Sequence, residues 1–371
     1  MSRTVVISIN ASWNVINFRQ GLIAAMRTKG WRVVALAPSD EYSPRLAALG
    51  VEHVPIAIDS LGLSPVRDIG VLLRYYRLLR RIRPDVFLGY TAKPNVYGSL
   101  AAQMLGIRVI NNISGLGTAF IGGGLLRRIV SWLYRIALRR SAVVFFQNPE
   151  DRDLFLDLGL VQPDQTRLLP GSGIDLARFT PEQRLPSTDG TFTFLLVGRL
   201  LRQKGVREFV EAARMVRRQF PDARFQLLGF LDAPNRSAIG RDEVAAWEAE
   251  GAVEYLGETD DVRPAVAASD CVVLPSYREG LPRTLLEGAA MAKPLIATDV
   301  PGCRQVVEHG VNGLLCAVGD AGSLADAMLE MLRLGEPEQS RMGAAGRARV
   351  ERDFAEARVV AAYLEAVGEP V

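Results

Sequence analysis

Residues Leu274 to Thr298 read LPSYREGLPRTLLEGAAMAKPLIAT, and this stretch decides the fold. The apolar run Cys271–Leu274 that leads into it predicts a buried parallel strand. A polar loop, Pro275–Gly280, follows, and Pro282 with the apolar residues after it predicts a helix. The next strand is expected at Pro294–Thr298. Strand, loop, helix and strand in this order indicate one unit of a parallel α/β sheet.

Two carboxylates and a group of backbone amides are expected to meet in this unit. Glu279 lies in the loop at the strand end, and Glu287 follows about one turn inside the predicted helix. The amides of Gly280 and Leu281 are expected at the helix N-terminus, where unpaired N–H groups bind anions. The pattern favours a ligand with phosphates and hydroxyls. The alternative is that Glu279 caps the helix and Glu287 is a solvated helix residue.

The chain is long enough for two domains, because it has 371 residues and single cores rarely grow beyond about 250–300. Strand and helix patterns alternate in both halves, which predicts two α/β domains of the Rossmann type. We expect them at residues 1–182 and 190–371, with C-terminal helices able to cross back to the first domain. No G-x-G-x-x-G follows the first strand, Thr4–Ile9, so the first domain is not expected to hold a dinucleotide.

Charge is unevenly divided between the two halves. Residues 1–185 contain 23 Lys and Arg against 13 Asp and Glu, and the remaining residues contain 21 against 28. A basic first half predicts an anionic partner: nucleic acid, anionic lipid or a phosphorylated acceptor. Nucleic acid is disfavoured, because no recognisable binding module is present and the aromatic residues do not line a strand face as stacking platforms.

Cysteine and histidine residues are too few to predict a metal site, and they also bear on the cellular compartment. Three cysteines and two histidines show no metal-ligand spacing, so we expect no metal site and a reducing cytoplasm. Asp151-Arg152-Asp153 spells D-x-D, but it opens a predicted helix, where acidic residues complement the helix dipole. No signal peptide is apparent and no apolar run reaches the length of a membrane span, about 18 residues.

One helix carries a membrane-like pattern. Residues Leu125–Arg140 read LLRRIVSWLYRIALRR, in which five arginines alternate with aliphatic and aromatic residues. This is typical of a helix that lies on an anionic membrane surface. The alternative is an ordinary surface helix whose arginines are solvated.

Strand ends provide the remaining candidate residues, because open α/β sheets bind ligands there. After the strand Phe192–Val197, Gly198 permits close approach of a phosphate, and Arg199 and Lys204 supply positive charge; the alternative is two solvated cations. Gly257 ends a further strand, near which a nucleotide base would lie. In the first half, Lys93 and Asn95 follow the strand Val86–Tyr90 as candidate acceptor contacts or as solvated loop residues. Gly115 and Gly117 follow Arg108–Ile113, where they permit either close approach of a ligand or simply flexible turns.

Three motifs together resemble glycosyltransferase family four. They are G-R-x4-K-G at Gly198–Gly205, E-G-L-P-x4-E at Glu279–Glu287 and G-I-D-x3-F-x-P at Gly173–Pro181. The N-F-R of Asn17–Arg19, the K-P-N of Lys93–Asn95 and the G-L-G of Gly115–Gly117 are similar to the branch that extends lipid-linked oligosaccharides. The resemblance covers nearly the whole chain and implies a GT-B fold, in which two Rossmann-like domains face each other and a helical tail follows.

The resemblance also implies roles for the candidate residues. Arg199 and Lys204 would neutralise the leaving diphosphate, and Glu279 would lie against the donor sugar and the reacting face. Glu287 would bind the ribose hydroxyls, and the amides of Gly280 and Leu281 a phosphate. Donor-site roles extend to Gly198 and Gly257, and acceptor-site roles to Asn17, Arg19, Lys93, Asn95, Gly115 and Gly117.

The implied activity is retaining and metal-independent transfer of a sugar, an N-acetylhexosamine such as GalNAc, from a UDP-sugar to a polyprenyl-diphosphate-linked saccharide in bacterial glycan assembly. No cofactor is implied, and the protein is expected at the inner face of the inner membrane as a peripheral protein. One departure is visible: related enzymes often carry a histidine near the end of the strand Val86–Tyr90, where this chain has Thr91, Ala92 and Lys93. Alternatives are a GT-B UDP-sugar epimerase, a transferase with another donor or a soluble acceptor, and a nucleotide sensor without catalysis.

Overall fold

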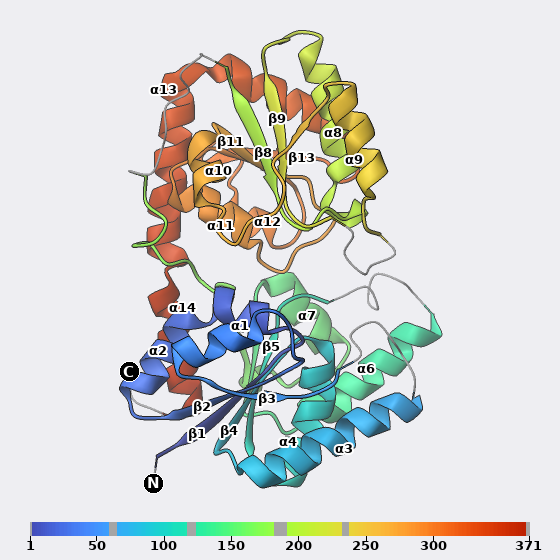
Figure 1. The fold of residues 1–371 in the computed structure, drawn as a ribbon, viewed down its shortest axis with the longest axis vertical. Coiled ribbons are helices and arrows are strands. Elements are labelled where there is room, and N and C mark those ends of the chain that lie inside the picture. The colour runs from blue at the N-terminus through green and yellow to red at the C-terminus, as the bar shows by residue number, and fades with distance from the viewer. Residues whose placement is uncertain (1, 59–64, 117–123, 182–190, 232–236, 369–371) are drawn as a thin grey trace. The chain divides into compact units, whose positions relative to one another are not determined.

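The computed structural model describes residues 2–58, 65–116, 124–181, 191–231 and 237–368, and it divides into two compact units (Figure 1). The first unit contains Met1–Ser172 together with Glu356–Val371, and the second contains Gly173–Ala355. Each unit is a parallel α/β sheet with helices on both faces. The expected pair of Rossmann-like domains is therefore confirmed.

The first unit is built on a seven-stranded sheet in the order β3-β2-β1-β4-β5-β6-β7, with every neighbouring pair parallel. Strand order reverses between β1 and β4, and this switch point is where such sheets bind ligands. The strands are β1 Thr4–Ser8, β2 Arg32–Ala37, β3 Glu52–Pro55, β4 Val86–Tyr90, β5 Arg108–Ile113, β6 Val143–Phe146 and β7 Thr166–Leu168.

Both faces of this sheet are covered because its strands are apolar on both sides. Val5 and Ile7 of β1 lie in one core cluster and Val6 lies in the other, as the alternation of side chains along a strand requires. The helices are α1 Ser12–Phe18, α2 Gln20–Thr28, η1 Ser43–Leu49, α3 Pro65–Ile82, the π-helical turn η2 Pro94–Gly98, α4 Ser99–Met104, α6 Leu125–Leu138, α7 Pro149–Asp157, η3 Pro163–Gln165 and α14 Glu356–Val367.

The second unit repeats this plan with six parallel strands in the order β10-β9-β8-β11-β12-β13. Its switch point lies between β8 and β11. The strands are β8 Thr193–Val197, β9 Arg224–Leu228, β10 Glu254–Tyr255, β11 Cys271–Leu274, β12 Leu295–Thr298 and β13 Gly313–Cys316. The helices are η5 Arg202–Lys204, α8 Val206–Arg217, α9 Arg241–Ala249, α10 Arg263–Ala268, α11 Arg283–Ala290, α12 Cys303–Val306 and α13 Ala321–Asp353.

The C-terminal helices differ from the sequence pattern, which predicts one helix over Leu324–Leu334 and a second over most of Gln339–Ala366. α13 is kinked at Gly335, whose φ is 73°, and ends at Asp353. Ala355 then pairs with Ile174 as an isolated β-bridge, so the chain is extended there before α14 begins. Ile174 and Phe179 are buried in the core of the second unit. The boundary between the units thus lies at Ser172, earlier than the linker expected near residues 182–190.

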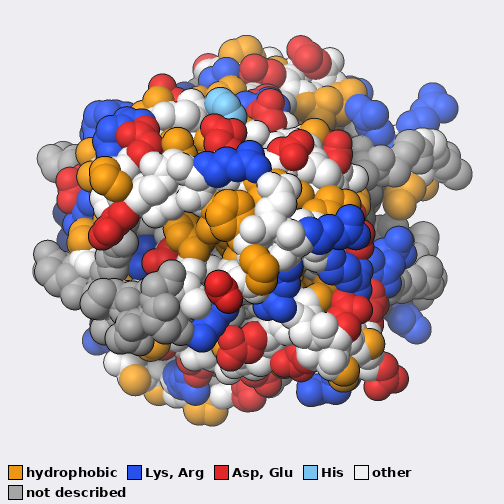
Figure 2. All heavy atoms as spheres, turned by 90° about the horizontal axis from the view of Figure 1, so that it is seen from above, with side chains coloured by type: hydrophobic (Ala, Val, Ile, Leu, Met, Phe, Trp, Pro, Cys, Tyr) orange, Lys and Arg blue, Asp and Glu red, His pale blue; other side chains and the backbone are white. Residues whose placement is uncertain are grey.

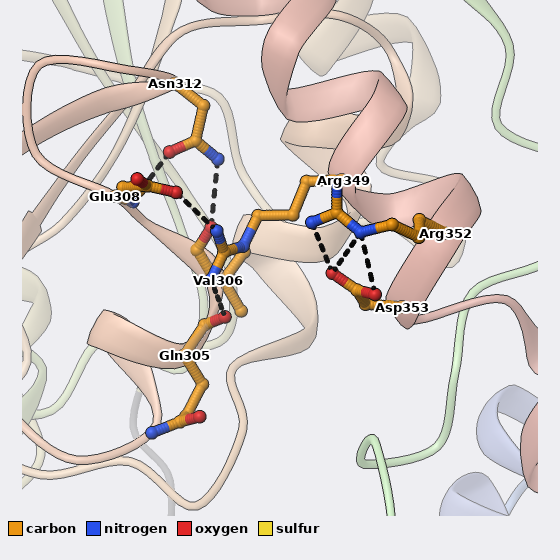
Figure 3. Close-up of polar contacts among 7 residues, drawn as sticks. All are labelled: Gln305, Val306, Glu308, Asn312, Arg349, Arg352 and Asp353. Atoms are coloured by element: carbon orange, nitrogen blue, oxygen red, sulfur yellow. Dashed lines mark hydrogen bonds and ion pairs between the residues drawn. The ribbon is translucent and has the colours of Figure 1, made fainter.

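Polar contacts fix the loop after α12 to the end of α13 (Figure 3). Arg349 donates to Oε2 of Glu308 at 2.8 Å and to the carbonyl of Gln305 at 3.1 Å. Asn312 donates to the carbonyl of Val306 at 2.9 Å and accepts from the amide of Glu308 at 2.7 Å. These bonds hold the short helix α12 in place, and α12 borders the loop that carries Glu279.

The helices and the surface bear on the expected membrane association. None of the helices in the described ranges is both long and apolar enough to cross a bilayer. Figure 2 shows one face of the molecule, on which Lys and Arg side chains are interspersed with Asp and Glu. This face therefore presents no uniform charge to a partner.

Candidate active site

Glycines end three neighbouring strands of the second unit. Gly198, Gly229 and Gly257 follow β8, β9 and β10, with φ values of 155°, 145° and 82°. The amide of Gly198 donates to the carbonyl of Leu228, and that of Gly229 to the carbonyl of Gly257, both at 2.9 Å. A Cβ on Gly229 would lie 1.8 Å from the carbonyl oxygen of Gly198. This strand edge is thus bare backbone, which a phosphate or sugar can approach closely.

The loop after β8 packs against the loop after β11. Gly205 has a φ of 72°, and a Cβ there would lie 2.1 Å from the carbonyl oxygen of Pro275. The amide of Tyr277 donates to the carbonyl of Gln203 at 2.9 Å. Lys204 and Glu279, 75 residues apart, consequently meet as an ion pair, with their side chains 22% and 13% exposed.

Arg199 differs from Lys204 in its surroundings. It is exposed at the end of β8, and its side chain makes no hydrogen bond or ion pair with the residues that the structure describes. Its charge is therefore available to an anionic ligand, whereas the charge of Lys204 is already balanced by a carboxylate. The sequence predicted both residues on one loop, and the structure shows that only Lys204 is paired with a carboxylate.

Glu279 is held from behind by the start of α12. Gly302 has a φ of 84°, and a Cβ there would lie 2.4 Å from the carbonyl oxygen of Gly280 and 2.7 Å from that of Glu279. Only glycine allows this approach. Thr298, at the end of β12, donates from its hydroxyl to the carbonyl of Ser276 in the same loop. The backbone that carries Glu279 is therefore fixed by contacts on two sides.

Glu287 is paired inside its own helix. Nε of Arg283 donates to Oε1 of Glu287 at 2.9 Å, and the two side chains are 18% and 12% exposed. Burial raises the pKa of the Glu287 carboxyl above its ordinary value of 4.5, and the charge of Arg283 opposes this shift. A carboxylate in this state is a strong acceptor for hydroxyl donors.

The helix N-terminus is displaced from its expected position. α11 begins at Arg283 with Pro282 as its N-cap, so Gly280 and Leu281 lie in the preceding loop rather than in the first turn. Leu281 packs its side chain against the apolar core. The amides that the end of α11 presents are therefore those of Arg283 and the residues after it, because proline has no N–H.

The acceptor candidates of the first unit fall into two groups. Asn95 is 1% exposed. Its side-chain Nδ2 donates to the backbone carbonyl of Asn112, and its Oδ1 accepts from Nδ2 of Asn111, both at 2.9 Å. It is therefore part of a buried structural network, not the ligand contact expected from the sequence. Lys93 forms an ion pair with Asp68 at 2.7 Å, with side chains 12% and 9% exposed.

The other candidates line the N-terminal helices and a strand end. Asn17 donates to the carbonyl of Trp13 at 2.9 Å. Arg19 is 5% exposed, and its guanidinium carbon lies 4.2 Å from the ring centre of Tyr90. Gly115, with a φ of 149°, follows β5 and is partly exposed, and Gly117 lies outside the described residues.

The D-x-D sequence lies near the start of α7, as expected, but of its two carboxylates only Asp151 is in the first turn. Asn148 caps α7 by accepting from the amide of Asp151 at 2.7 Å, and it donates to Oδ2 of Asp151 at 3.2 Å. Asp151 is fully buried, whereas the side chain of Asp153 is 54% exposed beside Arg152. The two carboxylates are thus in different surroundings at the start of a helix.

Comparison with known proteins identifies the family. The profile of the glycosyl transferase 4-like domain matches residues 16–171, and that of glycosyl transferases group 1 matches residues 191–333. The crystal structure of HepE from Anabaena in complex with UDP and glucose superposes with a TM-score of 0.78 at 16% identity, covering 98% of this chain and 99% of HepE. The chain belongs to the glycosyltransferases with the GT-B fold.

Two relatives of this glycosyltransferase are similar over most of their length. The N,N'-diacetylbacillosaminyl-diphospho-undecaprenol alpha-1,3-N-acetylgalactosaminyltransferase of Campylobacter jejuni is 27% identical over 351 residues, covering 91% of this chain and 90% of that protein. The UDP-Gal:alpha-D-GlcNAc-diphosphoundecaprenol alpha-1,3-galactosyltransferase of Escherichia coli is 25% identical over 280 residues, covering 72% of each.

Several residues beside the candidate sites were not predicted from the sequence to be site residues. Gly229 lies against the backbone of Gly198, and Gly302 lies against that of Glu279 and Gly280. A glycine directly after a strand or before a helix was the available signal. Thr91, directly after β4, has a φ of 63°, which a β-branched residue rarely adopts. Tyr363 comes from α14, and no sequence signal linked it to Arg19.

Proposed function

We propose that this glycosyltransferase moves an N-acetylhexosamine such as GalNAc from a UDP-sugar to a polyprenyl-diphosphate-linked saccharide, with retention of anomeric configuration and without a metal or other cofactor. The observation that carries the proposal is the similarity to the Campylobacter jejuni enzyme over 91% of this chain. The Escherichia coli relative, whose name also contains a diphosphoundecaprenol sugar, supports the same acceptor class.

The donor site supports departure of a nucleoside diphosphate. Arg199 has no charged partner among the described residues, Lys204 is a second cation that is paired with Glu279, and the first amides of α11 add a helix terminus. Preorganised positive charge of this kind stabilises the developing charge on a leaving diphosphate. Glu287, buried and in contact with Arg283, is the proposed acceptor for the ribose hydroxyls.

Glu279 is proposed to orient the donor sugar rather than to act as a free nucleophile. Its carboxylate is bound to Lys204 and is only 13% exposed, which limits its ability to attack. Retention would then follow from attack of the acceptor hydroxyl on the same face of the sugar that the diphosphate leaves. The ion pair would keep the carboxylate charged and correctly placed beside that face.

Membrane contact of the first unit is supported by α6. Four apolar side chains of this helix are 39–59% exposed at helical spacing: Leu126, Ile129, Trp132 and Ile136. Arg128 is exposed on the same helix, and Arg139 and Arg140 are exposed directly after it. On α3, Ile69 and Leu73 are 59% and 46% exposed. We propose that this surface lies on the anionic inner face of the inner membrane, where the acceptor's lipid would be found.

The test is a nucleotide-release assay with purified protein. A panel of UDP- and GDP-sugars would be offered, each with and without a detergent-solubilised polyprenyl-diphosphate saccharide. UDP release from UDP-GalNAc that requires the lipid acceptor is the expected result, and nuclear magnetic resonance of the product would show an α-linkage. A chelator should leave the rate unchanged.

Two outcomes would redirect the assignment. Release or isomerisation without acceptor would favour the epimerase alternative, which shares the fold and a nucleotide site. Acceptor-dependent release from a different nucleotide sugar would keep the transferase and replace the donor.

A further inference from the structure

Arg19 carries a buried positive charge that the described part of the chain leaves unbalanced. The residue joins α1 to α2 and is 5% exposed. Its Nε and Nη1 atoms are buried without a hydrogen-bond partner, and no ion pair among the described residues involves it. Arginine is almost never buried without a counter-charge, because removing an ion from water is costly. The fold therefore maintains a charge that it does not itself satisfy.

Aromatic side chains hold this guanidinium at the switch point of the first sheet. Tyr90 is the last residue of β4 and lies beneath the guanidinium. Tyr363 of α14 lies 6.1 Å from Tyr90 between ring centres and 4.9 Å from Phe145. Its hydroxyl accepts from Asn112 at 2.8 Å. The rings attract a cation through their quadrupoles but supply no formal negative charge, so the site still lacks an anion.

The neighbouring charged groups do not provide that anion. Lys93, the other cation near this strand end, is paired with Asp68. A Cβ on Gly21 would lie 2.4 Å from Oε2 of Glu356, so a carboxylate faces the first turn of α2, yet the ion pairs of the described residues do not join Glu356 to Arg19. Thr91, next to Tyr90, is held in a left-handed conformation, the kind of backbone strain found at ligand sites.

We propose that Arg19 anchors an oxyanion subsite of the first unit that takes a phosphate or diphosphate group, with Tyr90 and Tyr363 holding the guanidinium in place. Arginine binds phosphate oxygens with two parallel hydrogen bonds. Nε and Nη1 are buried without a hydrogen-bond partner, and Nη2 is not among such atoms, so the approach that we assign to the ligand is along the Nη2 edge. The inference rests on the proposed function, in which the group would be the diphosphate of the lipid acceptor.

The test measures anion binding apart from turnover. All proteins would carry Arg199→Met and Lys204→Met, which removes the two donor-site cations. Thermal unfolding and calorimetry would use inorganic pyrophosphate in one arm and farnesyl diphosphate in the other. Arg19→Met replaces the cation by an apolar side chain of similar length, Arg19→Lys keeps the charge, and Arg27→Met is the matched control, an exposed arginine on α2.

We expect pyrophosphate to raise the melting temperature of the parent protein and of the control Arg27→Met, both of which keep Arg19. Arg19→Met should bind pyrophosphate at least tenfold more weakly, and Arg19→Lys should lie between. Without ligand, Arg19→Met should melt at the same or a higher temperature, because a buried unpaired charge has been removed. Tighter binding of farnesyl diphosphate than of pyrophosphate would support a lipid ligand, and equal binding would support a diphosphate group without its lipid.

Two results would overturn the subsite. One is unchanged pyrophosphate affinity in Arg19→Met. The other is a large fall in its unliganded melting temperature with the ligand-induced shift retained, which would make Arg19 a packing cation. The proposed function fails separately: Arg19-dependent pyrophosphate binding by a protein that transfers sugar to no lipid acceptor would retain the subsite and remove the activity. The opposite case would be an Arg19→Met protein, otherwise wild type, that releases UDP in the presence of the acceptor with an unchanged acceptor KM. That result would support the proposed activity and reject the subsite.

Discussion

At the scale of single residues, the ion pair of Lys204 and Glu279 carries the clearest consequence. Its two side chains come from loops after different strands and are mostly shielded from solvent. A pair of this kind contributes little net stability, because desolvation offsets the attraction, but leaving one partner alone is costly. The pair therefore adds little to the stability of the fold, and the proposed reaction gives it a role.

We predict that Lys204→Met lowers kcat by about 10²–10³-fold, the usual loss when one donor of a charge-stabilising site is removed. The double variant Lys204→Met/Glu279→Gln should recover thermal stability, because no carboxylate is left unpaired, without recovering kcat. Steady-state kinetics and thermal unfolding would measure both. Arg207→Met is the control, since Arg207 forms an exposed pair with Glu243. A kcat within threefold of wild type in Lys204→Met would contradict the role.

The raised pKa of Glu287 predicts a pH dependence. Burial favours the protonated carboxyl in the native state, so the native protein holds its proton to higher pH than the unfolded chain. The stability that this group contributes is complete below the ordinary pKa of 4.5 and is lost as pH rises through the native pKa. Ribose hydroxyls would bind the ionised form, so UDP affinity should increase over the same interval.

Calorimetric titration of the protein with UDP would test this rise in affinity. The titrations would run from about pH 4.5, near the ordinary pKa of a glutamate carboxyl, to about pH 7. Phosphate ionisation of UDP contributes equally to wild type and to Glu287→Gln, so the difference between the two isolates Glu287. We expect the variant to bind more weakly at pH 7 and the gap to narrow as pH falls. A gap that stays constant with pH would mean that Glu287 does not contact the nucleotide.

At the scale of elements, the sequence predicted the strands well because buried parallel strands are continuous apolar runs. β1, β4, β5 and β11 lie within a residue of their expected bounds. It missed α1 and η2, which are short and have weak periodicity, and β3, which has only four residues. The candidate donor-site residues could be predicted because they lie in short motifs that are continuous in sequence. The surroundings of Arg19 could not be predicted, because Tyr90 and Tyr363 come from segments far apart in sequence.

The exposed stripe of α6 gives a prediction at this scale. Ile129→Gln/Trp132→Gln should weaken binding to anionic vesicles by at least tenfold, since burying one large apolar side chain is worth about 1.5–3 kcal/mol. Vesicle co-sedimentation at two salt concentrations would measure it, and binding of wild type should fall at high salt. Leu168→Gln is the matched control, because Leu168 is 46% exposed on β7 of the same unit. Equal binding of wild type to neutral and anionic vesicles would argue against an electrostatic membrane contact.

At the scale of the whole molecule, the chain leaves the first unit at Ser172 and returns to it at Glu356. α14 is thus separated from its unit by 183 residues of the second unit, Gly173–Ala355. Four large apolar side chains of α14 are buried in the core of the first unit: Val359, Tyr363, Leu364 and Val367. Arg108 donates to the carbonyl of Ala366 and Arg3 to that of Val367, which satisfies the end of the helix.

We predict that a chain ending at residue 355 loses the fold of its first unit and keeps that of its second. Removing four buried side chains costs about 6–12 kcal/mol at 1.5–3 kcal/mol each, which is comparable to the whole stability of a domain, about 5–15 kcal/mol. Limited proteolysis should degrade the region before Gly173 and spare the rest. A peptide of residues 356–368 added in trans should restore protection, whereas the same peptide with Tyr363→Ser and Leu364→Ser should not. A truncated chain that unfolds its first unit cooperatively at the wild-type temperature would show that this unit folds without α14.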